Sequence, residues 1–296
     1  MGVTSIYQST SDFAVLVVLS VRLEKIYAAV SLSRSEFKMT DGIPNILEEM
    51  NAIQLRKNVN SKTVAIIVFG ACENHGDHMP FGSDFFVPME LARRVASHAS
   101  NVLVLPAFPY GVSSHHSDFQ MTVTLEPITL IKAIEDICLS LIKNGIRRIL
   151  IINGHDGNIA PIELSARTLK DKYPDAIIAC LEAWWTVIGQ VSKDLFDDWN
   201  GLGHGGEAET SAMLSVRSDL VDMKNAPEKI IPKLPANIRI YWRFNELTQT
   251  GATGAPRKAT RAKGDKILEV LEQLLLEFIN DMEKDNWKYG LALGER

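Results

Sequence analysis

From residue 64 onward, short apolar runs alternate with segments of helical periodicity, and this alternation limits the fold more than any other feature. The apolar runs are continuous, as in strands buried on both faces, and lie at residues 64–71, 101–108, 147–155 and 176–185. Apolar residues recur every third or fourth position in the segments expected to be helices, residues 84–99, 125–145, 158–173, 206–217 and 263–285. Strands that alternate with helices form βαβ units. We therefore predict an α/β fold, a three-layer domain with a mostly parallel sheet flanked by helices.

The charge and cysteine content exclude several classes of protein. The chain carries 31 Lys and Arg against 36 Asp and Glu, a net charge of -5, so it has no basic footprint for nucleic acid. Its three cysteines, Cys72, Cys138 and Cys180, are widely spaced and form no Cys-x-x-Cys pair. A sparse, odd cysteine count argues against a disulfide framework and is typical of a reducing compartment. We expect a cytoplasmic protein.

The longest early apolar run, "FAVLVVLSV" at residues 13–21, is too short for a membrane helix. A spanning helix needs about 20 apolar residues, and Arg22, Glu24 and Lys25 follow this run directly. We expect no membrane partner.

Polar clusters follow two of the predicted strands. Glu73 and His75 come directly after the run at 64–71, and His155 ends the run at 147–155. Because the carboxyl ends of parallel strands meet at one edge of a sheet, these side chains are expected to lie close together. Asp84 follows a turn rich in Gly and Pro, and Glu209 lies at a predicted helix start. Two imidazoles and three carboxylates are more ligands than one divalent ion needs, which favours two ions.

Each cluster alone has a simpler explanation. A Glu-x-His pair is usually part of a solvated loop, and "NGHDGN" (153–158) can be a turn in which Asn and Gly adopt left-handed backbone. Likewise, "HGGEAE" (204–209) can be a helix start whose acids complement the dipole. Their joint occurrence at strand ends and helix starts favours the metal site.

Four motifs resemble those of the creatininase (creatinine amidohydrolase) family. The segment "GACENHGDHMPFGSD" is similar to the family's G-[ST]-x-E-x-H-G-x-H-L-P-x-x-T-D, and "NGHDGN" to its N-G-H-G-G-N. The segment "HGGEAETS" is similar to its H-A-G-x-x-E-T-S, and "GATGAPRKATRAKG" to its G-x-x-G-x-P-x-x-A-T-x-x-K-G element. The motifs follow the family's order and cover roughly residues 40–285, but they are not specific for a substrate.

The resemblance implies a metal-dependent hydrolase of the amidohydrolase type with two divalent ions per chain, which are zinc, manganese or iron. It assigns His204 as a proton shuttle and Asp84 as the bridging ligand. The positions that match the family's metal ligands are Glu73, His75, Asp84, His155 and Glu209. It further implies a small-molecule substrate and a homo-oligomer, often a hexamer.

Two departures from the family pattern bear on the substrate. The creatinine-cleaving enzyme has a Glu at the position of Gly157, and the family has a glycine at the position of Met121. Both changes alter the pocket, so we expect a substrate other than creatinine. The basic residues in "PRKATRAKG" (256–264) favour a larger or more anionic one. Substrate contacts are predicted for His116, Met121, Gly157 and Asn158.

The resemblance also suggests a domain boundary. In the family the Glu-x-His pair lies a few tens of residues from the start, and Glu73 falls at that distance when counted from Met39. Residues 1–38 show no clean periodicity. We expect residues 39–296 to form the creatininase-like hydrolase domain and residues 1–38 to be an N-terminal extension whose status stays open.

The leading functional hypothesis is hydrolysis of a cyclic amide, formamide or related carbon–nitrogen bond. One alternative is a cyclic-ketone hydrolase of sugar or inositol breakdown, which cleaves a carbon–carbon bond. Another is a non-catalytic binding protein that keeps its metals for structure. The presence of His204 beside the five ligand positions favours an enzyme, because a structural site closes its coordination and needs no proton shuttle.

Overall fold

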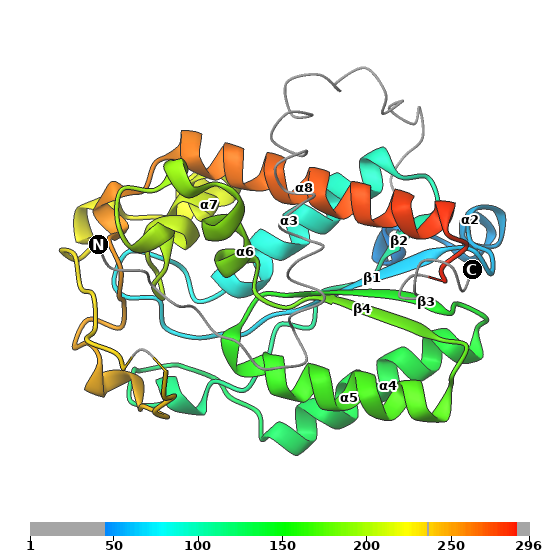
Figure 1. Ribbon diagram of the computed structural model, residues 1–296, viewed down its shortest axis with the longest axis horizontal. Helices are drawn as coiled ribbons and strands as arrows, with labels where there is room; N and C mark the ends of the chain where they lie inside the picture. The colour runs from blue at the N-terminus through cyan, green and yellow to red at the C-terminus, as the bar shows by residue number, and fades with distance from the viewer. Residues whose placement is uncertain (1–44, 236, 289–296) are drawn as a thin grey trace.

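The computed structural model describes residues 45–235 and 237–288 (Figure 1). Within these residues, four strands form one parallel sheet in the order β2-β1-β3-β4. The strands are β1 (Val64–Phe69), β2 (Val102–Val104), β3 (Arg148–Asn153) and β4 (Ile177–Leu181). The predicted α/β fold with a parallel sheet is therefore confirmed. The predicted extension 1–38, with its apolar run at 13–21, lies outside the described residues.

Helices cover both faces of the sheet. They are α2 (Ala52–Asn58), α3 (Ser83–His98), α4 (Pro127–Lys143), α5 (Ile159–Lys172), α6 (Trp184–Val191), α7 (Glu207–Arg217) and α8 (Arg261–Lys284). In Figure 1, α3, α6, α7 and α8 lie above the sheet, and α4 and α5 lie below it. The result is a three-layer arrangement.

Two expectations from the sequence were wrong in detail. The run at 101–108 is a regular strand only over β2, and beyond Val104 it meets β1 again at an isolated parallel bridge between Phe69 and Phe108. The strand expected at 176–185 ends at Leu181, and Trp184 begins α6 instead. A short apolar run does not by itself distinguish a buried strand from a buried helix.

The side chains of β1 point alternately into two separate cores. Val64, Ile66 and Val68 pack with α3, α7 and α8, whereas Ala65 and Ile67 pack with α4 and α5. Every residue of β1 is buried, which explains why its sequence is apolar without alternation.

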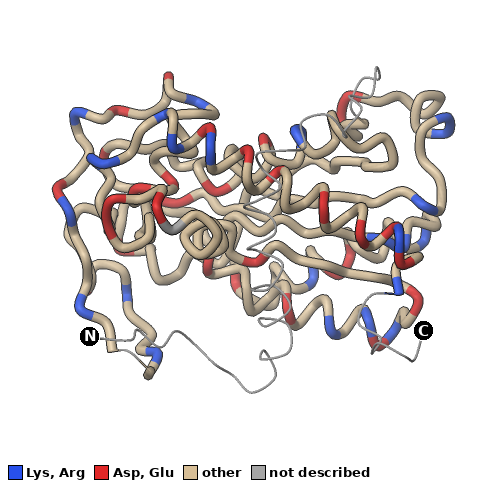
Figure 2. Tube along the Cα trace, turned by 45° about the horizontal axis from the view of Figure 1, so that its top comes forward, with Lys and Arg blue, Asp and Glu red and all other residues tan. Residues whose placement is uncertain are grey.

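The four strands are parallel, so their carboxyl ends all lie at the same end of the sheet, on the left in Figure 1. This end is called the carboxyl edge of the sheet. The loops that follow β1 and β3 begin there, and the loop before α7 lies at the same end of the molecule. Figure 2 shows Lys and Arg interspersed with Asp and Glu along the described trace. No helix among the described residues has the length and apolar character that crossing a membrane requires.

Candidate metal centre

A cluster of buried acids and histidines lies at the carboxyl edge of the sheet. Glu73 and His75 follow β1, and they are 0% and 1% exposed. Asp84 lies in the first turn of α3, His155 lies just beyond β3, and His204 precedes α7. The fold therefore gathers side chains from three chain segments that are far apart in the sequence.

A close backbone contact brings α3 against the end of β3. A Cβ atom on Gly154 would lie 1.8 Å from the main-chain oxygen of Asp84, so only glycine permits this approach. The neighbouring Asn153 holds the loop, because its side chain accepts from the His155 N–H at 3.1 Å and donates to the His155 carbonyl at 2.7 Å. Asp84 and His155 are thus placed side by side.

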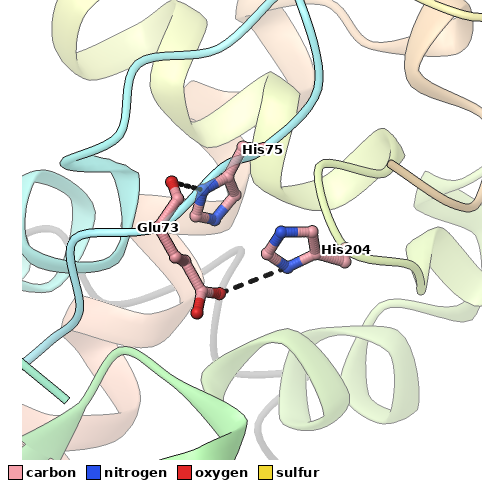
Figure 3. A group of neighbouring side chains, drawn as sticks. All are labelled: Glu73, His75 and His204. Atoms are coloured by element: carbon pink, nitrogen blue, oxygen red, sulfur yellow. Dashed lines mark hydrogen bonds and ion pairs between the residues drawn. The ribbon is translucent and has the colours of Figure 1, made fainter. Parts of the chain in front are cut away.

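The side chains meet through a small set of short distances. Asp84 Oδ1 lies 2.9 Å from His75 Nε2, and Asp84 Oδ2 lies 3.3 Å from His155 Nδ1. Glu73 Oε1 lies 3.2 Å from His155 Nδ1 and 3.6 Å from His204 Nδ1. Figure 3 shows the Glu73 carboxylate directed toward the His204 ring, with His75 alongside.

Each of the three histidines has its other ring nitrogen close to a main-chain carbonyl. The distance is 3.1 Å from His75 Nδ1 to Glu73 O, 3.0 Å from His155 Nε2 to Val112 O, and 2.7 Å from His204 Nε2 to Asn74 O. A carbonyl only accepts, so each of these nitrogens carries the proton. The opposite nitrogen then faces the carboxylates, an arrangement typical of metal-ligating histidines.

The carboxylates fit a site for cations. Glu73 Oε1 and Oε2 and Asp84 Oδ2 are buried without a hydrogen-bond partner. Within residues 45–235 and 237–288, the ion pairs of these two acids involve only histidines. A buried carboxylate is expected either to pair with a positively charged side chain or to coordinate a metal ion. Two groups of candidate ligands share Glu73, and each brings its ligand atoms within 4.8 Å of one another: Glu73, His75 and His204; and Glu73, Asp84 and His155.

The acids of the cluster change the pKa of the imidazoles beside them. Burial alone would lower the pKa of His75, but the Asp84 carboxylate raises it to about 10. Burial is likewise outweighed at His155, where Glu73 and Asp84 raise the pKa well above its ordinary value. Both shifts come from the carboxylates of Glu73 and Asp84 that face these two rings.

Glu209 lies in the first turn of α7, outside both candidate groups. Its Oε2 accepts from the Gly205 N–H at 2.6 Å. Burial raises the pKa of Glu209 to about 7, although the nearby His75 acts in the opposite direction. The structure thus brings four of the five predicted ligands into direct contact, and Glu209 interacts with them electrostatically. Its role as a ligand stays a prediction.

An aromatic side chain that the sequence did not single out covers the cluster. The Phe244 ring lies 4.1 Å from the His116 ring and 4.9 Å from the His204 ring, measured between centroids. His116 is 2% exposed, and its Nδ1 has no hydrogen-bond partner. Phe244 belongs to a short 3-10 helix, η8 (Phe244–Glu246), in a segment without periodicity. No local sequence signal marks it.

The other predicted substrate contacts lie in different surroundings. Met121 is 69% exposed and adopts a left-handed backbone with φ of 64°. Asn158 is fully buried, and its amide binds main-chain groups of Gly70 and Val112. Gly157 lies directly against the Val112 carbonyl. Contact of these residues with a substrate stays a prediction.

Two basic residues of the run at 256–264, Arg257 and Lys263, are engaged in other contacts. Arg257 pairs with Glu228, and Lys263 pairs with Glu207 and Asp197. Glu207 is completely buried, so Lys263 neutralises an internal charge. These contacts remove the reason for assigning the two side chains to an anionic substrate, because their charges are already compensated.

Comparison with known proteins places these motifs in one family. Residues 48–279 match the sequence profile of "Creatininase: Creatinine amidohydrolase". The chain is 31% identical to a creatinine amidohydrolase of Pseudomonas putida, over 74% of this chain and 89% of that protein. It is 26% identical to a mycofactocin precursor peptide peptidase of Mycobacterium tuberculosis, over 70% of this chain and 80% of that one.

Solved structures show the same fold. A structure described as "Creatininase Mn" superposes with a TM-score of 0.69 at 27% identity, covering 82% of this chain and 98% of that one. A mutant creatininase described as "Zn-Zn type" gives a TM-score of 0.68 at 27% identity, covering 82% and 99%.

Proposed function

The chain belongs to the creatininase family and is a metal-dependent hydrolase, and we propose that it cleaves a cyclic amide, formamide or related carbon–nitrogen bond of a small molecule other than creatinine. The observation that carries this proposal is the meeting of Glu73, Asp84 and three histidines at the carboxyl edge of the sheet. Ligands of α/β enzymes bind at this edge.

Two divalent ions would be held by Glu73, His75, Asp84, His155 and Glu209. The family relatives with manganese and zinc support zinc or manganese as the ions. Asp84 is suited to serve both positions, because its two oxygens face different histidines. Such ions act as Lewis acids on a carbonyl oxygen and make water a better nucleophile at neutral pH.

His204 is the residue we assign to proton transfer. Its Nε2–H is held by the Asn74 carbonyl, so the ring is fixed and Nδ1 faces the centre. A fixed imidazole can accept a proton from the attacking water and return it to the leaving nitrogen. Phe244 and His116 pack against this ring and restrict the access of solvent.

The choice against creatinine rests on two positions. Gly157 supplies no carboxylate where the creatinine-cleaving enzyme has one, so a substrate group that needs this partner would lose a hydrogen bond. An unpaired polar group in a site costs about 1–3 kcal/mol. Met121 adds an exposed apolar side chain where the family has a glycine.

Peptide-bond hydrolysis is a second candidate. The similarity to mycofactocin precursor peptide peptidases favours it. It would use the same proposed ligands and the same proton shuttle, because a peptide bond is also a carbon–nitrogen bond next to a carbonyl.

A screen of the metal-loaded protein tests these proposals. The substrates are creatinine, several lactams, a formamidopyrimidine nucleotide, short peptides and cyclic ketones, and the Asp84→Ala protein serves as the matched inactive control. Turnover of a lactam or formamide supports the first proposal, and turnover of peptides alone supports the second. Efficient turnover of creatinine contradicts the choice against it, and turnover of ketones alone shows that the enzyme cleaves carbon–carbon bonds.

The assembly state belongs to the same proposal. Large apolar side chains are exposed in the segment 231–241, among them Ile238 at 73% and Tyr241 at 86%. A homo-oligomer, with a hexamer as the form suggested by the family, would cover them. Light scattering measures the mass in solution, and a monomer at micromolar concentration contradicts this proposal.

A further inference from the structure

The main-chain carbonyl of Val112 contacts the His155 ring on the side away from the carboxylates. It accepts the Nε2–H at 3.0 Å. This carbonyl therefore decides which ring nitrogen carries the proton and which one faces Glu73 and Asp84.

Asn158 holds the Val112 peptide in place. Its Oδ1 accepts from the Val112 N–H at 3.0 Å, and its Nδ2 donates to the Gly70 carbonyl at 3.0 Å. The side chain is completely buried, and both ends of its amide are hydrogen-bonded. It thus ties the acceptor of His155 to the end of β1, which carries Glu73 on the same loop.

Gly157 leaves the space that this hydrogen bond occupies. A Cβ atom at this position would lie 2.0 Å from Val112 O and 2.7 Å from His155 Nε2. Both distances are far below van der Waals contact, so any side chain here would push the donor and the acceptor of the same hydrogen bond apart. With the backbone conformation of this chain, the hydrogen bond between His155 and Val112 therefore requires a residue without a side chain at position 157.

We propose that Gly157 and Asn158 are positioning residues that orient His155 through the Val112 carbonyl. The inference rests on the proposed role of His155 as a metal ligand. It assigns Gly157 and Asn158 a task that does not depend on contact with the substrate. Partners that orient metal-binding histidines typically contribute about 10–100-fold to metal affinity.

Zinc affinity measured by competition with a chromogenic chelator tests this role without any substrate. Asn158→Ala and Gly157→Ala should each weaken zinc binding about 10–100-fold. The matched control is Asn45→Ala. Asn45 is also a buried amide, and it donates to the Ser100 and Val102 carbonyls at the opposite edge of the sheet. This control should lower thermal stability but leave zinc affinity unchanged.

Nitrogen-15 NMR of the zinc-loaded protein gives a second readout. In the wild type, the Nε2 proton of His155 should be protected from exchange with water, and this protection should be lost in Asn158→Ala. If Gly157→Ala does not fold, Asn158→Ala alone decides the question. The proposal would be overturned if Asn158→Ala kept the zinc affinity and the proton protection of the wild type. Its stability alone would then be lowered, as in Asn45→Ala.

If His155 were not a metal ligand at all, the same measurements would give a different result. If His155→Ala binds both ions as tightly as the wild type, then His155 is not a ligand, and there is no ligand to position. That result refutes the assignment of His155 as a metal ligand. If instead His155→Ala loses zinc affinity and Asn158→Ala keeps it, only the positioning role is refuted.

Discussion

The side chains of Glu73 and His155 meet across two neighbouring strands, with Oε1 of the acid 3.2 Å from Nδ1 of the imidazole. Glu73 follows β1 and His155 follows β3, which pair in parallel along the whole of β1. The candidate metal centre therefore depends on the register of the central strands, and changes in its proposed ligands can be tested separately from the fold.

Asp84→Ala should lower metal occupancy at both proposed positions. The reason is that Oδ1 faces His75 and Oδ2 faces His155, so one carboxylate serves both sides. Elemental analysis of the purified protein measures the ions per chain, and Asp219→Ala, a change in an exposed acid, is the control. One ion per wild-type chain, or two in Asp84→Ala, would be inconsistent with a shared carboxylate.

His204→Ala should keep its metals and lose turnover by about 10²–10⁴-fold, the usual contribution of a proton-transferring residue. The measurements are metal content and the initial rate on the substrate found by the screen. His98→Ala, which removes a histidine paired with Glu272 between α3 and α8, should retain full activity. Loss of metal from His204→Ala would make His204 a ligand, since its Nδ1 lies 3.6 Å from Glu73 Oε1.

Chelation of the metals should destabilise the protein. A ligand present at 100 times its dissociation constant stabilises the native state by about 2.7 kcal/mol. Without cations, the buried carboxylates Glu73 and Asp84 have only histidines as ion-pair partners among the described residues. Thermal unfolding before and after treatment with a chelator measures this effect, and re-addition of zinc or manganese should restore the original midpoint. An unchanged midpoint in the metal-depleted protein would contradict the expectation.

Lys263→Met should lower the free energy of unfolding by about 3–5 kcal/mol, the usual cost of leaving a buried charge unpaired. Lys263 pairs with Glu207, which is fully buried and also accepts from the N–H groups of Asp197 and Asp198. Urea unfolding gives the value.

The matched control for this change is Lys266→Met on the same helix. Lys266 forms an exposed pair with Glu269, and such pairs contribute about 0–1 kcal/mol. Adding Glu207→Gln to Lys263→Met should recover part of the loss. Equal effects of the two lysine substitutions would show that burial of Glu207 is not the cause.

A chain that begins at Met39 should remain soluble and as active as the full chain. We propose this because the family match covers residues 48–279, so the segment 1–38 lies outside it. Metal content and turnover of the shortened protein provide the measurement. Insolubility or reduced metal content would show that residues 1–38 belong to the catalytic domain.

The sequence by itself determined the layered α/β architecture and the edge at which the polar clusters gather. Continuous apolar runs marked β1 and β3, and the position of Glu73, His75 and His155 after those strands placed them at one edge. These conclusions were accessible because strand burial and the direction of parallel strands follow from local patterns.

Only the tertiary structure decided which groups surround these side chains. Phe244 lies against His116 and His204, and the Val112 carbonyl holds the His155 ring, yet neither residue lies in a periodic segment or a motif. Loops take their paths from contacts with distant parts of the chain, because their backbone groups have no regular partner nearby. Such contacts leave no local pattern, so they become visible only when the chain is folded.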